Sequence, residues 1–201
     1  MPRANGKQTV SAGPYATAAD FKQIFTEDIN SLYLLSLLLT ENHENAEKCF
    51  VEGIGESTKG NRVFKEWARS WARRTIIQSA IRLMNPGEGS APTKRTAEGG
   101  VGDRIPMVLH PEVGAILELA PLERFVFVMS VLERYSDNDC SVLLGCARRD
   151  VVTTRARAMQ QLAMLLGLKH DSPADAGAKT SIELIIAEHF ATAAWTASLS
   201  R

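Results

Sequence analysis

The feature that most constrains how this chain can fold is a run of helical patterns between Glu118 and Leu166, interrupted by one glycine. Pro121 stands at the first position of a helical pattern, where its missing N–H leaves no hydrogen bond unmade. The large apolar residues after it recur at helical spacing and form one stripe: Leu122, Phe125, Val126, Met129 and Leu132. This spacing predicts an amphipathic helix that closes near Tyr135.

A short second helix and a longer third helix follow. Ser136 or Asp137 is a suitable N-cap for the second helix, and Gly145 can adopt the left-handed conformation that ends it. The residues expected to face inward on this helix are Cys140, Leu143 and Leu144. The third helix opens near Arg149 and continues past Leu162. Two helices joined by a tight turn at a glycine, the second one rich in arginine, predict a helix-turn-helix, in which the second helix enters the major groove of DNA.

The sequence leaves two registers open for the inward face of the third helix. One apolar stripe consists of Val151, Ala158, Leu162 and Leu165, and the other consists of Val152, Ala156, Met159 and Ala163. The two stripes differ by one residue position, so the inward face is ambiguous by one residue.

Charge is distributed unevenly although the net charge of the 201-residue chain is zero. Residues 20–56 hold eight acidic residues and two lysines, whereas residues 59–82 hold seven basic residues and one glutamate. The neutral total therefore conceals an acidic segment followed by a basic one, and only the basic segment suits a polyanionic partner.

The chain has few residues that could bind a metal or carry out catalysis. Cys49, Cys140 and Cys146 form no CxxC or Cys/His cluster, so we expect small buried apolar residues rather than zinc ligands. The four histidines are scattered, and no nucleophile elbow, phosphate-binding loop or dinucleotide fingerprint is present. The sequence predicts no catalytic residue, no metal, no cofactor and no enzymatic activity.

Hydropathy gives no indication of a membrane partner. The longest apolar run, residues 32–39, is far too short to span a bilayer, and the N-terminal residues lack the apolar segment of a signal peptide. We therefore expect a cytoplasmic protein with reduced thiols.

The order of helical patterns and breaks predicts an all-α fold with two small helical domains. The expected divisions are a disordered tail over 1–19, a helical domain over 20–84, a flexible linker over 85–107, a helix-turn-helix domain over 108–169, and a C-terminal extension over 170–201 with one amphipathic helix. The linker is rich in Gly, Pro, Ser and Thr, and as a random coil it would hold its ends about 25 Å apart.

Within the first domain, three details can be predicted from single residues and patterns. The apolar stripe Ile29, Leu32, Leu35, Leu38 and Leu39 indicates a helix that is buried on most of its circumference. Asn45 is a plausible cap for the next helix, and Gly53, Gly55 and Gly60 are expected to end it. A further helix is expected over residues 61–84, with Phe64, Trp67, Ala68 and Trp71 on one face.

Two sets of dispersed residues carry a resemblance to a known family. The first set is Leu122, Glu123, Arg124, Val126, Phe127, Tyr135, Ser136, Leu144, Gly145, Val151, Arg157, Ala158 and Leu162, and it resembles region 4 of bacterial RNA polymerase sigma factors. The second set is Ala46, Glu47, Phe64, Trp67, Ala72, Arg73 and Arg82, and it resembles region 2 of the extracytoplasmic-function class of these factors. The resemblance implies binding to the RNA polymerase core, at the β′ clamp and the β flap, and to double-stranded promoter DNA, with an anti-sigma factor as a further partner.

The third helix of the region 4-like part supplies the candidate DNA contacts. We expect Arg148, Arg149 and Thr153 to contact base edges, because the N-terminal part of a recognition helix faces them. Arg155 and Arg157 are candidates for phosphate or edge contacts, although Arg155 stands where the family has an aliphatic residue. The alternative is that these arginines form an ordinary solvated helix face.

The region 2-like part supplies candidate contacts to single-stranded promoter DNA. Trp67 and Trp71 could stack on unpaired bases, with Arg69, Arg73 and Arg74 holding the backbone. The alternative is that the two tryptophans belong to the core of the domain. Two functions therefore stay open: a sigma-factor-like initiation protein, or a helix-turn-helix regulator that occupies DNA without binding polymerase.

Overall fold

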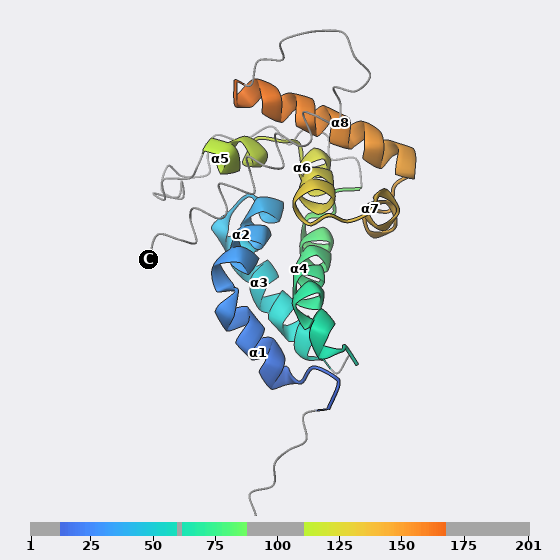
Figure 1. Ribbon diagram of the computed structural model, residues 1–201. Helices are drawn as coiled ribbons and strands as arrows, with labels where there is room; N and C mark the ends of the chain where they lie inside the picture. Colours follow the sequence, from blue (N-terminus) through green and yellow to red (C-terminus); the bar gives the residue numbers. More distant parts are fainter. Residues whose placement is uncertain (1–12, 60–61, 88–110, 168–201) are drawn as a thin grey trace, which may run out of the picture.

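The computed structural model describes residues 13–59, 62–87 and 111–167, and within these ranges every regular element is a helix (Figure 1). The predicted all-α fold is confirmed. The N-terminal bundle consists of α1 (Ala18–Glu27), α2 (Ile29–Thr40), α3 (His43–Thr58) and α4 (Ala68–Met84). The C-terminal bundle consists of α5 (Pro111–Leu117), α6 (Pro121–Phe127), α7 (Asp137–Leu144) and α8 (Arg148–Leu165).

Helix α2 forms the centre of the N-terminal bundle because it is apolar nearly all the way round. Its second half, residues 35–40, is buried without a break against α3, α4 and α6. Two polar residues are buried there as well, and Ser36 and Thr40 satisfy their hydroxyls by donating to backbone carbonyls one turn earlier. Ile29, predicted to join the inward stripe, is instead 50% exposed at the start of the helix.

Helix α3 differs from the prediction at both ends. Its N-cap is Asn42 rather than Asn45, because the Asn42 side chain accepts a hydrogen bond from the backbone N–H of Asn45 at 2.8 Å. Gly53 does not end the helix, which continues to Thr58. A Cβ atom at Gly53 would lie 2.8 Å from a side-chain carbon of Ile76, so this glycine lets α3 and α4 approach closely.

Helix α4 begins later than predicted. Residues 65–67 form a 3₁₀ turn, and the α-helix starts at Ala68. The chain before this turn pairs with the segment ahead of α1, where the Ala16 N–H donates to the Val63 carbonyl at 2.7 Å. Residues 13–19, expected to belong to a disordered tail, are therefore placed against the bundle, while residues 1–12 lie outside the described residues.

In the C-terminal bundle, three predicted helix boundaries are confirmed, whereas the first helical segment ends at Leu132 and not near Tyr135. Pro121 opens α6, Ser136 caps α7 by accepting from the Asp139 N–H at 3.1 Å, and Gly145 ends α7 at φ 65°. Between α6 and α7 the chain makes a π-helical turn over residues 128–132, in which the Glu133 N–H donates to the carbonyl of Val128 at 2.9 Å. Short helix α5, which the sequence analysis did not predict, packs against α2 and α8.

The structure settles the register of α8. Val151, Ala158 and Leu162 are fully buried against the bundle, whereas Val152 is 43% exposed. The stripe that begins at Val151 is therefore the inward one, except that Leu165 at its end is exposed.

The two bundles contact each other directly and share one apolar core. Helix α2 packs against α5 and α6, and α4 packs against α7. Among the described residues, ion pairs cross between the bundles from Arg124 on α6 to Glu41 and from Arg73 on α4 to Glu133. Of the predicted linker, residues 88–107 lie outside the described residues, as does the predicted C-terminal helix within 170–201.

Candidate nucleic-acid interface

Helix α8 presents one continuous exposed face on the side opposite its buried stripe. Arg149, Thr153, Ala156 and Gln160 are all exposed and follow one another at spacings of four, three and four residues, which places them on a single line along the helix. In Figure 1, α8 lies across one end of the molecule, over α6 and beside α7. The turn at Gly145 joins α7 to α8, the two helices that the sequence analysis predicted on either side of this glycine.

The arginines at the start and in the middle of α8 are available for contacts. Arg148 and Arg157 are exposed and form no ion pair within the described ranges. The side chain of Arg149 is 89% exposed, and its contact with neighbouring Asp150 is long, at 3.6 Å. Thr153 is exposed too, with its hydroxyl donating to the carbonyl of Arg149 at 2.8 Å.

Arg155 lies in a different environment from the other predicted DNA contacts. Its side chain is largely buried, and its guanidinium donates to the carboxylate of Asp137 in the first turn of α7. This ion pair joins the two helices on either side of the Gly145 turn. Arg155 therefore links α8 to α7 and is absent from the exposed face of α8.

The exposed face of α8 also includes residues that the sequence analysis did not select. Gln160 continues the line of Arg149 and Thr153 by two further helical turns, and a Gln side chain can pair with adenine through two hydrogen bonds. The sequence did not show that Gln160 faces outward, because the register of α8 was undecided. Once the buried stripe is known, the spacing of seven residues from Thr153 places Gln160 on the exposed face.

In the N-terminal bundle, the two predicted tryptophans lie in different environments. Trp67 is 58% exposed, and its ring meets that of Phe64 edge-on, with 5.3 Å between the ring centroids. The ring of Phe64 also contacts the ring of Tyr15, with 4.8 Å between those centroids. Trp71 is half-buried and packs against the core, and its indole Nε1 is buried without a partner in the described part of the chain. The expectation that Phe64 and Trp67 share an inward face with Ala68 is wrong, because the helix starts only at Ala68.

The arginines predicted to hold a single strand are largely paired with acids. Arg69 forms ion pairs with Glu27 and Asp28, and the hydrogen bond to Asp28 raises the pKa of Arg69. Arg73 donates from Nε and Nη2 to the two carboxylate oxygens of Glu133, both at 2.6 Å, and this raises the pKa of Arg73. Arg74 is half-buried.

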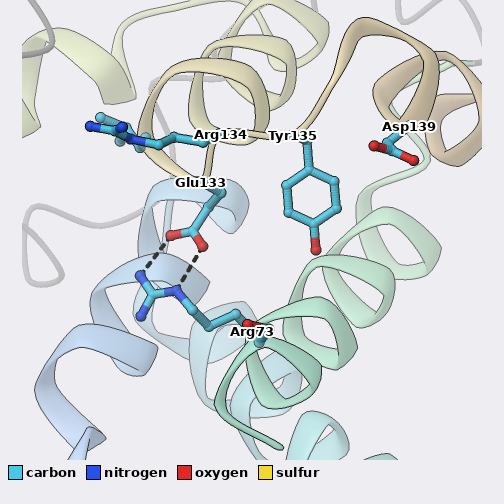
Figure 2. A pocket seen from close by; sticks show the side chains of 7 residues that line it. Arg73, Glu133, Arg134, Tyr135 and Asp139 are labelled. Carbon is cyan, nitrogen blue, oxygen red and sulfur yellow. Dashed lines mark hydrogen bonds and ion pairs between the residues drawn. The ribbon is translucent and has the colours of Figure 1, made fainter. Parts of the chain in front are cut away.

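The Arg73–Glu133 pair lines an open pocket between the bundles (Figure 2). Its walls are Ser70, Arg73, Leu132, Glu133, Arg134, Tyr135 and Asp139, and its volume is about 560 Å³. Figure 2 shows Glu133 reaching from the end of the π-helical turn to Arg73 on α4, while Arg134 points away. Burial raises the pKa of Tyr135, so its hydroxyl stays protonated and can act as a hydrogen-bond donor in this pocket.

The second ion pair between the bundles joins a buried arginine, Arg124, to Glu41, whose side chain is 43% exposed. The Arg124 side chain has no exposed surface, and it contacts the Glu41 carboxylate and the carbonyl of Leu119, the latter at 3.2 Å. Its Nε and Nη2 atoms are buried without a hydrogen-bond partner among the residues described. Burial lowers the pKa of Arg124. A guanidinium with unsatisfied donors is costly to keep away from water.

Other chemistry is sparse in the part of the chain that the structure covers. No group of three or more His, Cys, Asp and Glu side chains there could hold a metal ion. None of the described helices is long and apolar enough to cross a bilayer. Cys140 is buried, as expected, whereas Cys146 is only half-buried. Cys49 is buried too, and burial raises the pKa of the Cys49 and Cys140 thiols to about 11.

Comparison with known proteins gives a distant structural likeness and no match to a protein family. No protein-family model matches the sequence, and no curated protein matches it. Among solved structures, the chain is similar to the sigma factor RpoE of Bartonella quintana, which was crystallised with the anti-sigma factor NepR. The identity is 18%, the match covers 75% of this chain and 99% of that chain, and the TM-score is 0.44. A likeness at this level does not assign the chain to a family.

Proposed function

We propose that this protein is a sigma-factor-like transcription initiation protein, which binds the RNA polymerase core and directs it to promoter DNA. The observation that carries the proposal is the exposed face of α8. That helix follows a glycine turn after α7, buries Val151 and Leu162, and leaves Arg148, Arg149 and Thr153 exposed near its N-terminal end. This is the part of a recognition helix that contacts base edges in a major groove.

The chemistry of that face suits double-stranded DNA. An arginine can donate two hydrogen bonds to guanine, and such a pair discriminates against other bases by about 1–3 kcal/mol. Arg157 lies farther along α8 and is exposed, so it suits a phosphate contact that adds affinity without sequence preference. Arg155 contributes indirectly by tying α7 to α8.

The N-terminal bundle supports the promoter-melting part of the proposal through its exposed aromatic rings. Trp67, Phe64 and Tyr15 lie next to one another at the surface, beside exposed Lys65. Stacking of an unpaired base on an aromatic side chain contributes about 1–3 kcal/mol and tolerates any base. This surface is therefore the proposed contact to the single strand.

A second candidate function is a helix-turn-helix regulator that binds DNA without polymerase. The pairing of Arg69 with Glu27 and Asp28, and of Arg73 with Glu133, favours this candidate. Both guanidinium groups are already neutralised, so the N-terminal bundle offers fewer cations to a single strand than its sequence indicates.

The two candidates separate in a binding experiment with purified protein and core polymerase. If the protein is an initiation factor, it should comigrate with the core, contact the β′ clamp and the β flap, and support transcripts that begin at one position on a promoter template. A protein that shifts duplex DNA but never comigrates with the core would be the regulator. The cytoplasmic location stays a prediction from hydropathy, and the anti-sigma partner stays a prediction from the sequence resemblance.

A further inference from the structure

The last turn of helix α8 exposes large apolar side chains that none of the described elements covers. Met164 is 68% exposed and Leu165 is 48% exposed, and the two residues are neighbours in sequence. Leu165 also ends the stripe that is buried at Val151 and Leu162, so the apolar face of α8 continues past the described elements that cover it. Single exposed apolar residues are common on proteins, whereas an apolar face that continues past its cover is typical of a contact surface.

Helix α5 lies beside this end of α8. Figure 1 shows α5 next to the end of α8 that is farther from α7, and the two helices are in contact. Val113 and Leu117 on α5 are half-buried, so further apolar area is accessible there. We call Met164 and Leu165 the α8-end surface. It has room for a partner that packs on both α8 and the neighbouring short helix.

The chain changes direction directly after this surface. Gly167 has a φ of 64°, and its N–H donates to the carbonyl of Met164 at 3.2 Å. A glycine in this left-handed conformation ends a helix and turns the chain away from the helix axis. The fourteen residues 168–181 follow. As a random coil they span about 20 Å, so a segment that begins at residue 182 can return to the end of α8.

The sequence after residue 181 predicts a partner of suitable chemistry on the same chain. This segment, residues 182–199, lies outside the described residues, and it is the amphipathic helix expected from the sequence. Thr180 and Glu183 have the spacing of a capping box, which marks the start of a helix. Large apolar residues then recur at helical spacing on one face: Ile182, Ile185, Ile186 and Phe190. A face of this width is stable as a helix when another apolar surface covers it.

We propose that residues 182–199 form a helix that docks its apolar face on the α8-end surface of the same chain. Each of the two apolar faces covers the other. Because both are on one chain, the effective concentration of the segment at the surface is about millimolar, and a weak contact is sufficient to keep it bound. The inference goes beyond the proposed function, since neither polymerase nor DNA takes part in this contact.

The docked helix leaves the start of α8 free for DNA. Met164 lies fifteen residues after Arg149, which is roughly 22 Å along an α-helix. The N-terminal part of a recognition helix contacts base edges. The two surfaces of α8 therefore lie at opposite ends of the helix, and the contact with residues 182–199 is compatible with the proposed DNA contacts.

The first test is hydrogen exchange in the full-length chain. Residues 182–199 should exchange at least about tenfold more slowly than an unstructured peptide of the same sequence, because a docked helix opens only transiently. The double substitution Met164→Lys with Leu165→Lys should abolish this protection. Lysine is a good helix former and is favourable at a helix C-terminus, so α8 itself should stay intact. Val142→Lys is the matched control, because Val142 is an equally exposed apolar residue on α7, and it should leave the protection unchanged.

The second test examines the contact from both sides. The double substitution Ile185→Lys with Ile186→Lys should speed exchange over residues 160–167, where α8 loses its cover. A photoreactive benzoylphenylalanine placed at position 164 should form cross-links to residues 182–199 within one chain, whereas the same group at position 142 should form none.

Three results would overturn the proposal. The first is exchange of residues 182–199 at the unprotected rate in the unmodified protein. The second is protection that survives Met164→Lys with Leu165→Lys, which would place the segment elsewhere. The third is cross-links from position 164 that join two chains, which would show that a second copy occupies the surface. Comigration with core polymerase and duplex binding test the proposed function separately, so either conclusion can fail without the other.

Discussion

Helices α4 and α8 are both rich in arginine, yet the surroundings of their guanidinium groups differ. On α8, the side chains of Arg148, Arg149 and Arg157 are exposed, and Arg149 lies on the face opposite the buried stripe. On α4, Arg69 and Arg73 are held by acidic groups from α1, from the α1–α2 junction and from the end of the π-helical turn.

The difference arises from neighbours and not from the helices themselves. Helix α8 lies at one end of the part of the molecule that the structure describes, and there it contacts α5, α6 and α7 on its buried side (Figure 1). Helix α4 lies inside its bundle and also contacts α7, so acids from other elements reach its surface. Arginine content alone therefore does not identify a DNA-binding helix, because the exposure of each guanidinium group depends on the neighbouring elements.

The largest effect is expected from the buried side of α8. Leu162→Ala should lower the free energy of unfolding by about 2–5 kcal/mol, because Leu162 is fully buried and the substitution leaves a cavity. Urea denaturation of the full chain measures this. Gln160→Ala on the outward side is the control and should change stability little; equal losses from both substitutions would show that α8 is not oriented as described.

Next in size is the effect of Arg149 on sequence discrimination. Arg149→Ala should reduce the preference for the best duplex over single-base variants by about 1–3 kcal/mol, because a guanidinium on the exposed line of α8 would be lost from a base edge. Binding competition with a panel of duplexes measures it, and Arg148→Ala should act in the same direction. A uniform loss over all duplexes would instead place Arg149 at a phosphate.

The turn that presents α8 should show a smaller effect on stability. Gly145 has a φ of 65°, and any residue with a Cβ is strained in this left-handed conformation. Gly145→Ala should therefore cost about 1–2 kcal/mol of unfolding free energy, measured by thermal or urea denaturation. Gly55→Ala, where an added Cβ meets no atom within 4 Å, is the control and should not destabilise the protein.

The smallest expected effect is on the salt dependence of DNA binding, for which one arginine of α8 is compared with one of α4. Arg157→Ala should weaken binding to all duplexes alike and reduce the salt dependence of log K by about one unit, because one phosphate contact is lost. Arg69→Ala should leave this slope unchanged, because Arg69 is already neutralised by Glu27 and Asp28. Titrations at several salt concentrations measure both slopes. If Arg69→Ala reduced the slope as much as Arg157→Ala, the proposed difference between the two helices would be wrong.

The sequence predicted helix boundaries better in the C-terminal bundle than in the N-terminal bundle. In the C-terminal bundle, Pro121, Ser136 and Gly145 each act through the backbone of their own turn, so the local residue type was sufficient to place α6, α7 and the turn. In the N-terminal bundle, Gly53 is also a glycine, but it does not end a helix. It leaves space for the side chain of Ile76 on α4. A sequence pattern cannot distinguish these uses, because the second depends on a residue from another helix.

The candidate site on α8 was likewise predicted only in part. Arg149 and Thr153 were predicted and lie on the exposed face, whereas Arg155 turned inward to Asp137 and Gln160 joined the face unpredicted. Both differences follow from the register of α8, which apolar periodicity left open between two stripes. Packing against α6 and α7 buried the stripe from Val151 and thereby chose which polar residues face outward.

By itself, the sequence determined the helical class of the protein, the glycine turn and the position of an arginine-rich helix after it, since capping and apolar spacing act over a few residues. Only the tertiary structure decided which arginines are accessible. Ion pairs such as Arg73–Glu133 join residues sixty positions apart, and their formation depends on how the bundles pack and not on any local pattern.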